Sequence, residues 1–260
     1  MKQIVRTLTG AIVLIASSLL TLTACDTQKD GAPGPDKGGK SGYLVGKVTD
    51  PQGNPLVGAT IYTDNTVFKG RGAEVTTASD GTYQVQIPKD LGQWVSKGYI
   101  IKQYNDRVYK IVLDPENPDS FTAEEKPVRN FQWKLTGHVP DLSLDLYYGG
   151  TAELFRDPNV EGLQDSENIE FTFTPVGPLI DGSTGKTLKL QSNKLNRNFL
   201  KDIPIGRYKI SAVHKPTGEP LLVADAWGDD VNYGSSVTLD FIGTESYSRS
   251  NTMGVAFKKR

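Results

Sequence analysis

The chain has 260 residues, with 29 basic and 30 acidic side chains and a formal net charge of −1 at neutral pH. This balance provides no concentrated basic face, so we predict no nucleic-acid partner. The single cysteine, Cys25, excludes an intrachain disulfide, and the 27 glycines and 15 prolines favour turns over long helices.

The first 25 residues have the pattern of an export signal. Lys2 and Arg6 form a short basic region, and residues 8–22 form an apolar stretch that is too short for a lasting transmembrane helix. The stretch ends in Leu22-Thr23-Ala24-Cys25. This ending resembles the lipobox of bacterial lipoproteins, with Leu at −3, small residues at −2 and −1, and then the Cys.

The lipobox resemblance implies that Cys25 is lipidated. In that family the thiol receives a diacylglycerol, the signal peptidase cuts before the Cys, and the new amine is often acylated, for example with palmitate. Two or more acyl chains are what stable anchoring requires. We therefore predict a signal peptide at 1–24 and a protein anchored to the cell membrane or the outer membrane, facing the periplasm or the exterior. An ordinary secretory signal with a chance cysteine is the alternative.

Residues 26–42 have the composition of a flexible tether. They contain Gly, Pro, Asp and Lys and no large apolar side chain, which is typical of a disordered spacer. A flexible chain of this length places the first domain roughly 20–25 Å from the bilayer. Asp26 resembles the inner-membrane retention signal of enterobacterial lipoproteins, but other lineages do not follow that rule, so the choice of membrane stays open.

A first folded domain is expected at 43–136. Short runs with alternating polar and apolar residues, separated by Gly, Pro and Asp turns, are typical of an antiparallel β-sandwich. We predict strands at 43–49, 56–63, 75–77, 82–87, 98–102, 108–113 and 131–135.

Within this domain, a set of fixed spacings resembles the carboxypeptidase regulatory-like domain. The pattern is Gly46-x-Val48-x-Asp50-x-x-Gly53-x-Pro55-Leu56-x-Gly58-Ala59, followed by Thr76-Thr77-x-x-Asp80-Gly81-x-Tyr83. The resemblance covers roughly 43–113 and implies a seven-stranded, transthyretin-like β-sandwich. It implies structural roles for these residues and no peptidase activity, because that domain is an accessory module. The usual Pro-Gly-x-Tyr step is less well kept here.

A second β-sandwich is expected at 137–260. The predicted strands are 142–148, 151–155, 169–175, 188–190, 221–224, 236–241 and 255–257, and residues 199–210 lead into a further, late strand. Pro204-x-Gly206-x-Tyr208 resembles the step into a late strand of transthyretin-like sandwiches. The fold class is therefore all-β, with two antiparallel sandwiches. One larger domain is the alternative, and whether the second sandwich duplicates the first stays open.

No catalytic constellation is visible. His138 and His214 lie far apart in different turn contexts, and no nucleophile elbow, phosphate loop or zinc-ligand spacing occurs. The acidic runs at 157–167 and 225–230 lack calcium-hand spacing, so solvated loops are favoured over calcium sites. We predict no catalytic residue, no metal and no cofactor.

Aromatic residues are the remaining candidates for ligand contact. We single out Trp94, Tyr99, Trp227 and Tyr233, because exposed Trp and Tyr suit sugar stacking or a protein interface. Core packing is the competing interpretation for each.

The predicted function is that of a non-catalytic, lipid-anchored binding or scaffolding protein of the cell envelope. Its partners would be the membrane, through Cys25, and an envelope protein or a polysaccharide. The alternative is a carbohydrate-binding module, and a hydrolase or a hydrolase accessory is less favoured because no catalytic constellation is found.

Overall fold

The computed structural model describes residues 38–89, 91–140, 145–159 and 166–260. The described residues belong to one compact unit, Gly34–Arg260. The predicted leader, Cys25 and most of the tether lie outside the described residues. Within the described part of the chain, no helix has the length and apolarity needed to span a membrane.

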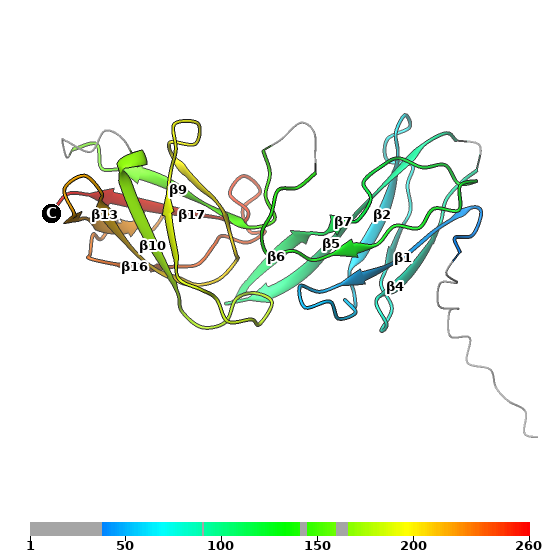
Figure 1. Ribbon diagram of the computed structural model, residues 1–260, viewed down its shortest axis with the longest axis horizontal. Helices are drawn as coiled ribbons and strands as arrows, with labels where there is room; N and C mark the ends of the chain where they lie inside the picture. Colours follow the sequence, from blue (N-terminus) through cyan, green and yellow to red (C-terminus); the bar gives the residue numbers. More distant parts are fainter. Residues whose placement is uncertain (1–37, 90, 141–144, 160–165) are drawn as a thin grey trace, which may run out of the picture. The chain divides into compact units, whose positions relative to one another are not determined.

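The fold is all-β, as predicted, and its strands form four sheets. The first eight strands form two of these sheets (Figure 1). They are β1 (Tyr43–Thr49), β2 (Thr60–Asn65), β3 (Glu74–Thr76), β4 (Thr82–Gln86), β5 (Trp94–Tyr104), β6 (Arg107–Val112), β7 (Asp114–Pro115) and β8 (Phe131–Gln132).

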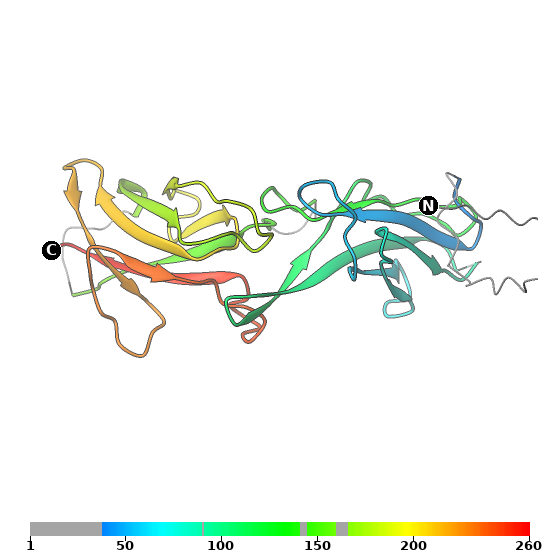
Figure 2. The same ribbon diagram turned by 90° about the horizontal axis from the view of Figure 1, so that it is seen from below.

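The first two sheets have the strand orders β4-β1-β8-β7 and β3-β2-β5-β6. Figure 2 shows them as separate layers, with β1 in blue and β5–β6 in teal. Along β5, every second residue from Trp94 to Ile100 is buried, which is the period of a strand with one face in a core. The opposite face of β5 carries Val95, Lys97, Tyr99 and Ile101.

The later strands form the other two sheets, with the orders β12-β9-β17-β15 and β11-β10-β13-β14, and β16 pairs with β13. Phe171 of β10 and Phe257 of β17 join these sheets by an edge-to-face contact of 5.5 Å. The elements are β9 (Gly150–Arg156), the 3-10 turn η1 (Ser166–Asn168), β10 (Ile169–Pro175), β11 (Leu188–Gln191), β12 (Phe199–Ile203), β13 (Tyr208–His214), β14 (Glu219–Pro220), β15 (Leu222–Asp225), β16 (Val237–Leu239) and β17 (Thr252–Lys258).

Two pairings differ from the purely antiparallel sandwiches that were predicted. β1 runs parallel to β8, and β9 runs parallel to β17. In each case the first strand of a set lies beside its last strand. Short-range patterning cannot reveal such a pair, because a parallel partner comes from a remote part of the chain.

The expected strand at 142–148 does not form as predicted. Residues 142–144 lie outside the described residues, and Tyr147 makes a single bridge to His138. Further backbone bonds join Val139 to Leu146 and Tyr148 to Gly137. We call residues 137–140 and 145–148 the linker hairpin, because they join β8 to β9.

The glycines of the family-like pattern have identifiable structural roles. A Cβ on Gly46 would lie 1.8 Å from the backbone oxygen of Arg129, so β1 admits no side chain there. The hydroxyl of Tyr83 donates to the same oxygen at 2.6 Å, and the Tyr83 side chain is buried. Gly58 has a φ of 73°, a conformation that L-residues rarely adopt, and β2 starts only at Thr60 rather than at residue 56.

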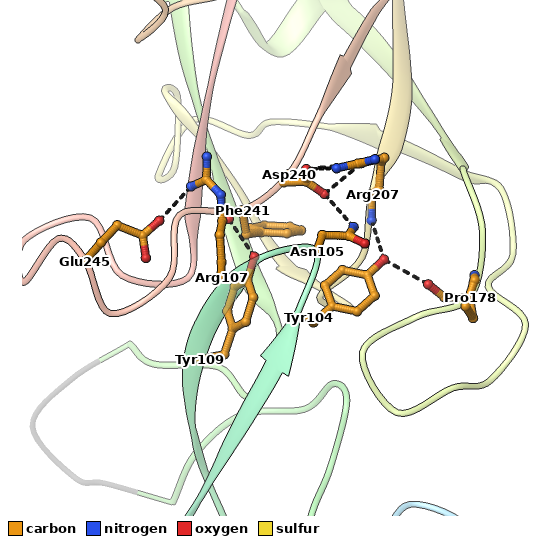
Figure 3. A network of polar contacts seen from close by, with 9 residues as sticks. All are labelled: Tyr104, Asn105, Arg107, Tyr109, Pro178, Arg207, Asp240, Phe241 and Glu245. Atoms are coloured by element: carbon orange, nitrogen blue, oxygen red, sulfur yellow. Dashed lines mark hydrogen bonds and ion pairs between the residues drawn. The ribbon is translucent and has the colours of Figure 1, made fainter.

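A polar network joins the turn between β5 and β6 to the second set of strands (Figure 3). Arg207 binds Asp240 through Nε at 3.1 Å and Nη2 at 2.6 Å, and Asn105 donates to Asp240 at 2.8 Å. The hydroxyl of Tyr104 donates to the oxygen of Pro178 at 2.8 Å and accepts from the backbone nitrogen of Arg207 at 3.0 Å. Through Tyr104 and Asn105, these bonds attach the turn between β5 and β6 to the second set of strands.

A second group of bonds continues this network along β6. The buried Tyr109 donates its hydroxyl to the oxygen of Phe241 at 2.7 Å, and Arg107 pairs with Glu245 at 2.8 Å. The apolar core also runs through both sets of strands without a break. The division into separate domains at 43–136 and 137–260 therefore stays a prediction.

Candidate functional site

A cleft of about 680 Å³ lies against the solvent-facing side of β2, β5 and β6. We call it the tyrosine cleft, because Tyr62, Tyr99, Tyr147 and Tyr148 all line it. Its volume is within the range of small-molecule and peptide side-chain sites. The other main lining residues are Val95, Lys97, Lys110, Val112, Pro115, Pro118, Val139, Pro140, Leu146, Thr151, Ser250, Asn251 and Thr252.

The floor of the cleft is set by strand register. Tyr62 on β2 lies opposite Lys97 on β5, and Tyr99 on β5 lies opposite Val112 on β6. The rings of Tyr62 and Tyr99 are 6.2 Å apart and tilted by 57°, so they do not form one flat platform. The ammonium of Lys110 lies 4.0 Å from the centre of the Tyr99 ring, a cation–π distance.

The linker hairpin forms a second wall of the cleft through Val139, Leu146 and Tyr147. Asp202 holds this hairpin at both ends. Its carboxylate accepts from the backbone nitrogen of Gly137 at 2.8 and 3.0 Å and from that of Gly149 at 3.3 Å. Asp202 can reach both groups because β12 has a register shift between Leu200 and Ile203 and Asp202 itself has a φ of 63°.

Tyr148 fixes the base of the hairpin against the first set of strands. Its side chain is buried, and its hydroxyl donates to Asp114 on β7. Lys134 also pairs with Asp114 and lies 5.9 Å from the Tyr148 ring. The hairpin is thus bonded to β7 on one side and to β12 on the other.

The cleft is cationic. Lys97 and Lys110 are its charged lining residues, and none of the described residues that line it is an Asp or Glu. Both lysines are exposed at the sheet surface. A ligand that enters this cleft therefore meets positive charge, tyrosine rings and aliphatic side chains together.

Three tyrosines of the cleft, Tyr62, Tyr147 and Tyr148, are neutral hydrogen-bonding groups. Burial, with Asp64 and Tyr99 nearby, raises the pKa of Tyr62. A hydrogen bond with Asp145 raises the pKa of Tyr147, and burial together with Asp114 raises the pKa of Tyr148. Because these shifts favour the protonated phenol, the hydroxyls suit ligand binding and do not provide a phenolate nucleophile.

Asn251 at the edge of the cleft has a buried acceptor, Oδ1, without a hydrogen-bond partner among the described residues. Its φ is 58°. Buried acceptors are normally paired, so this position is a local departure from the rest of the fold.

Two of the residues predicted as ligand contacts lie on β5, and only one of them lines the cleft. Tyr99 is on the solvent-facing side and forms part of the floor. Trp94 is 0% exposed in the core, which removes it from contact with any ligand at the surface. The period of β5 separates the two, because they differ by an odd number of positions.

Trp227 and Tyr233 lie away from the tyrosine cleft. Trp227 stacks edge-on against Phe155 at 6.1 Å, with Arg249 at 4.5 Å from its ring, in a separate shallow depression. Tyr233 packs under the ammonium of Lys258 at 4.2 Å. The four predicted aromatic residues therefore do not form one site.

The two histidines do not come together in one site. His138 lies 3.9 Å from Asp145 on the linker hairpin, whereas His214 contacts Thr217 at the end of β13. Asp225 accepts from the backbone nitrogen of Trp227 at 2.9 Å. Across the described residues, no group of His, Cys, Asp and Glu has an arrangement that could hold a metal ion.

Sequence reasoning missed Tyr62, Lys110 and Tyr147 as members of one site. The alternation of β2 and β6 places the first two on outward faces, but only the pairing with β5 brings them together. Tyr147 reaches the cleft because Asp202 holds the linker hairpin, a contact between distant residues that leaves no local signal.

The chain matches no known family model and no curated protein. Solved structures with similar parts include the TIE protein of Bacillus anthracis, at 16% identity and a TM-score of 0.32 over 84% of this chain and 34% of that one. A streptococcal ancillary pilin has 13% identity and a TM-score of 0.25 over 84% and 62%, and BcpA, the major pilin subunit of Bacillus cereus, has 11% and 0.23 over 85% and 100%. This chain thus spans about a third of the first protein and less than two thirds of the second. At these scores we take neither family nor function from the likeness.

Proposed function

We propose that this chain is a non-catalytic binding protein of the cell envelope, anchored by lipid on Cys25, and that the tyrosine cleft is its binding site. The observation that carries this proposal is the cleft lining, which combines tyrosines, two lysines and aliphatic side chains and has no carboxylate among its described residues. Such a lining offers recognition but neither a nucleophile and base nor an acid pair. The relation of the first sandwich to the carboxypeptidase regulatory-like domain is part of this proposal and rests on the residue pattern alone.

The lining favours a ligand with negative charge and an apolar face. Lys97 and Lys110 attract an anionic group, and Val112 and Leu146, which are 48% and 45% exposed, offer apolar contact. Neutral sugars are usually held by several carboxylates and amides, which pair with their hydroxyls, and the described residues of this lining include one amide, Asn251. An acidic segment of an envelope protein is therefore the favoured ligand over a neutral polysaccharide.

The test uses site-specific photo-crosslinking in living cells. With Cys25 acylated, a cysteine introduced into the cleft is the only free thiol of the chain. A benzophenone label on Val112→Cys should capture a discrete envelope ligand. The control is Val176→Cys, which is 44% exposed against 48% for Val112 and does not line the cleft.

The labelled variants separate three outcomes. Capture of a protein at position 112 but not at 176 supports the proposal, and capture of a polysaccharide supports the carbohydrate-binding alternative. Equal labelling at both positions contradicts a binding role for the cleft. As a second measurement, Lys97→Gln with Lys110→Gln should weaken binding of the captured ligand roughly tenfold, whereas Lys186→Gln with Lys209→Gln, outside the cleft, should leave it unchanged.

The anchor has its own test. Cells grown with labelled palmitate should incorporate it into the wild-type chain and not into Cys25→Ala. Because cleavage before the cysteine requires the lipid in the lipoprotein family, the variant should also keep its leader. Equal labelling of both chains, or a wild-type chain that keeps its leader, would contradict lipid anchoring.

A further inference from the structure

Several loops gather at one end of the first set of strands. β1 starts there at Tyr43, and its partner β4 ends there, because Tyr43 pairs with Gln86. β2 ends at the same place and β5 starts there, because Asn65 pairs with Trp94. Residues 38–42, 66–73, 87–89 and 91–93 therefore lie at one end, which we call the tether pole because the tether joins it.

The tether pole presents exposed apolar side chains. Val67 is 73% exposed, Phe68 is 55% exposed, and Leu91 in the neighbouring loop is 40% exposed. Isolated apolar residues are ordinary at a protein surface, but two consecutive ones at a loop tip, with a third beside them, are not.

The loop that carries Val67 and Phe68 is held in place rather than loosely attached. The buried side chain of Asn65 accepts from the backbone nitrogens of Val67 at 3.0 Å and Phe68 at 2.8 Å. Its amide nitrogen donates to the oxygen of Leu91 at 2.8 Å. One buried side chain thus fixes all three apolar residues at the same pole.

The length of the segment between Cys25 and the described residues limits how far the tether pole can lie from the bilayer. If Cys25 carries lipid, the segment from Cys25 to Gly38 spans at most about 45 Å when fully extended. The tether pole is then held within about 45 Å of the bilayer. Membrane lipid is accordingly the apolar phase within reach of Val67 and Phe68.

The charges of the pole decide which force would hold it there. The exposed basic residues are Lys40, Lys69, Arg71, Lys89 and Lys126, but Lys69 lies 3.6 Å from Asp64, and Glu124 and Glu125 are exposed in a loop whose residue Ala123 bonds Gly42. The surplus of basic side chains is small and adds only a modest attraction to anionic lipid. Burial of apolar area is therefore the main contribution.

We propose that Val67, Phe68 and Leu91 insert into the lipid interface when the chain is anchored, so that the first sandwich docks on the bilayer through its tether pole. This inference rests on the proposed lipid anchor. The docking holds the pole at the membrane surface and leaves the turn between β5 and β6 at the opposite ends of the strands.

The experiment uses the acylated chain reconstituted into vesicles. A nitrobenzoxadiazole (NBD) label on Val67→Cys reports polarity, and lipids with a nitroxide on the acyl chain quench it only at close approach. The matched control is Val57→Cys, which is 55% exposed, as Phe68 is, and which follows the turn at the other end of β1. We expect a blue shift and strong quenching at 67 and neither at 57.

Two further measurements test whether apolar burial holds the tether pole at the membrane, and whether a second copy of the chain covers the pole instead. The signal at 67 should appear on phosphatidylcholine vesicles without any phosphatidylglycerol, and it should be lost when Phe68→Ser is added. A blue shift at 67 in detergent, together with a doubled mass by ultracentrifugation, would mean that a second copy covers the pole and would overturn the inference.

The failure of the anchor and the failure of the docking are distinguishable. If the chain does not float with the vesicles in high salt, the lipid anchor is absent and the docking inference fails with it. If the chain floats but the label at 67 behaves like the label at 57, the anchor stands and the docking is wrong. Slow hydrogen exchange of residues 66–71 on vesicles relative to detergent supports docking without any substitution.

Discussion

Replacement of Asp202 by alanine should release the linker hairpin and with it one wall of the tyrosine cleft. The carboxylate of Asp202 accepts from the backbone nitrogens of Gly137 and Gly149, and Gly149 is buried. Loss of hydrogen bonds to a charged acceptor costs about 1.5–3 kcal/mol. Since the φ of Asp202 is 63°, alanine adds a strain of about 1 kcal/mol, because it tolerates this conformation less well than Asp does. The free energy of unfolding should therefore fall by about 2.5–4 kcal/mol.

Two further substitutions separate these contributions. Asp202→Gly removes the carboxylate but accepts the positive φ, so it should be less destabilising than Asp202→Ala by about 1 kcal/mol. Asp202→Asn keeps one acceptor oxygen and tolerates the same backbone, so it should lose the least. Urea unfolding followed by tryptophan fluorescence measures each free energy, and hydrogen exchange reports whether residues 137–140 and 145–148 open locally.

One result would refute this reasoning. If Asp202→Ala changes the free energy of unfolding by less than about 0.5 kcal/mol, which is typical of surface substitutions, and the hairpin amides exchange as in the wild type, then Asp202 does not hold the hairpin. A stability loss without faster exchange in the hairpin would place the cost in β12 instead.

Three other predictions follow from close contacts and from burial. Gly46→Ala should prevent β1 from packing beside the backbone of Arg129, with a loss of more than about 3 kcal/mol that thermal unfolding would detect, and a loss below 1 kcal/mol would contradict the close approach. In a double-mutant cycle, Arg207→Ala and Asp240→Ala should show a coupling of about 1 kcal/mol, and strictly additive losses would mean that the pair contributes nothing. Burial raises the pKa of Tyr109, so the folded state holds its phenol proton more tightly, and stability should fall as the pH rises above 10.0. Tyr109→Phe should weaken this alkaline destabilisation in unfolding measured against pH, and an unchanged pH dependence would contradict a buried phenol.

The sequence predicted correctly the strands whose ends are determined by neighbouring turn residues. β1 and β10 have the predicted bounds, because their flanking turns are marked by Gly, Pro and Asp. β8 is shorter than predicted and its partner, β1, is parallel, because that pairing depends on residues far away in the sequence. The same limit applies to the cleft. Tyr99 was found from its aromatic side chain, whereas its neighbours Tyr62 and Lys110 required the register of three strands.

Trp94 illustrates why residue type alone does not identify a binding residue. A tryptophan in a short alternating segment suits a core or a surface platform equally well, and only the phase of the alternation separates them. Here the phase buries Trp94 and leaves Lys97 and Tyr99 outside. The phase was readable in the sequence from Lys97, which is expected to face water.

The parallel pair of β9 and β17 has a mechanical consequence. A force applied to the N-terminal end of β9 and the C-terminal end of β17 shears the two strands past each other along their length. All of the hydrogen bonds between them then share the load at once, instead of breaking one after another as in a hairpin that is peeled apart. Resistance to such force depends on the unfolding rate rather than on equilibrium stability. A protein tethered to a cell and attached to something outside it would hold under tension for longer where the first and last strands of such a set lie side by side.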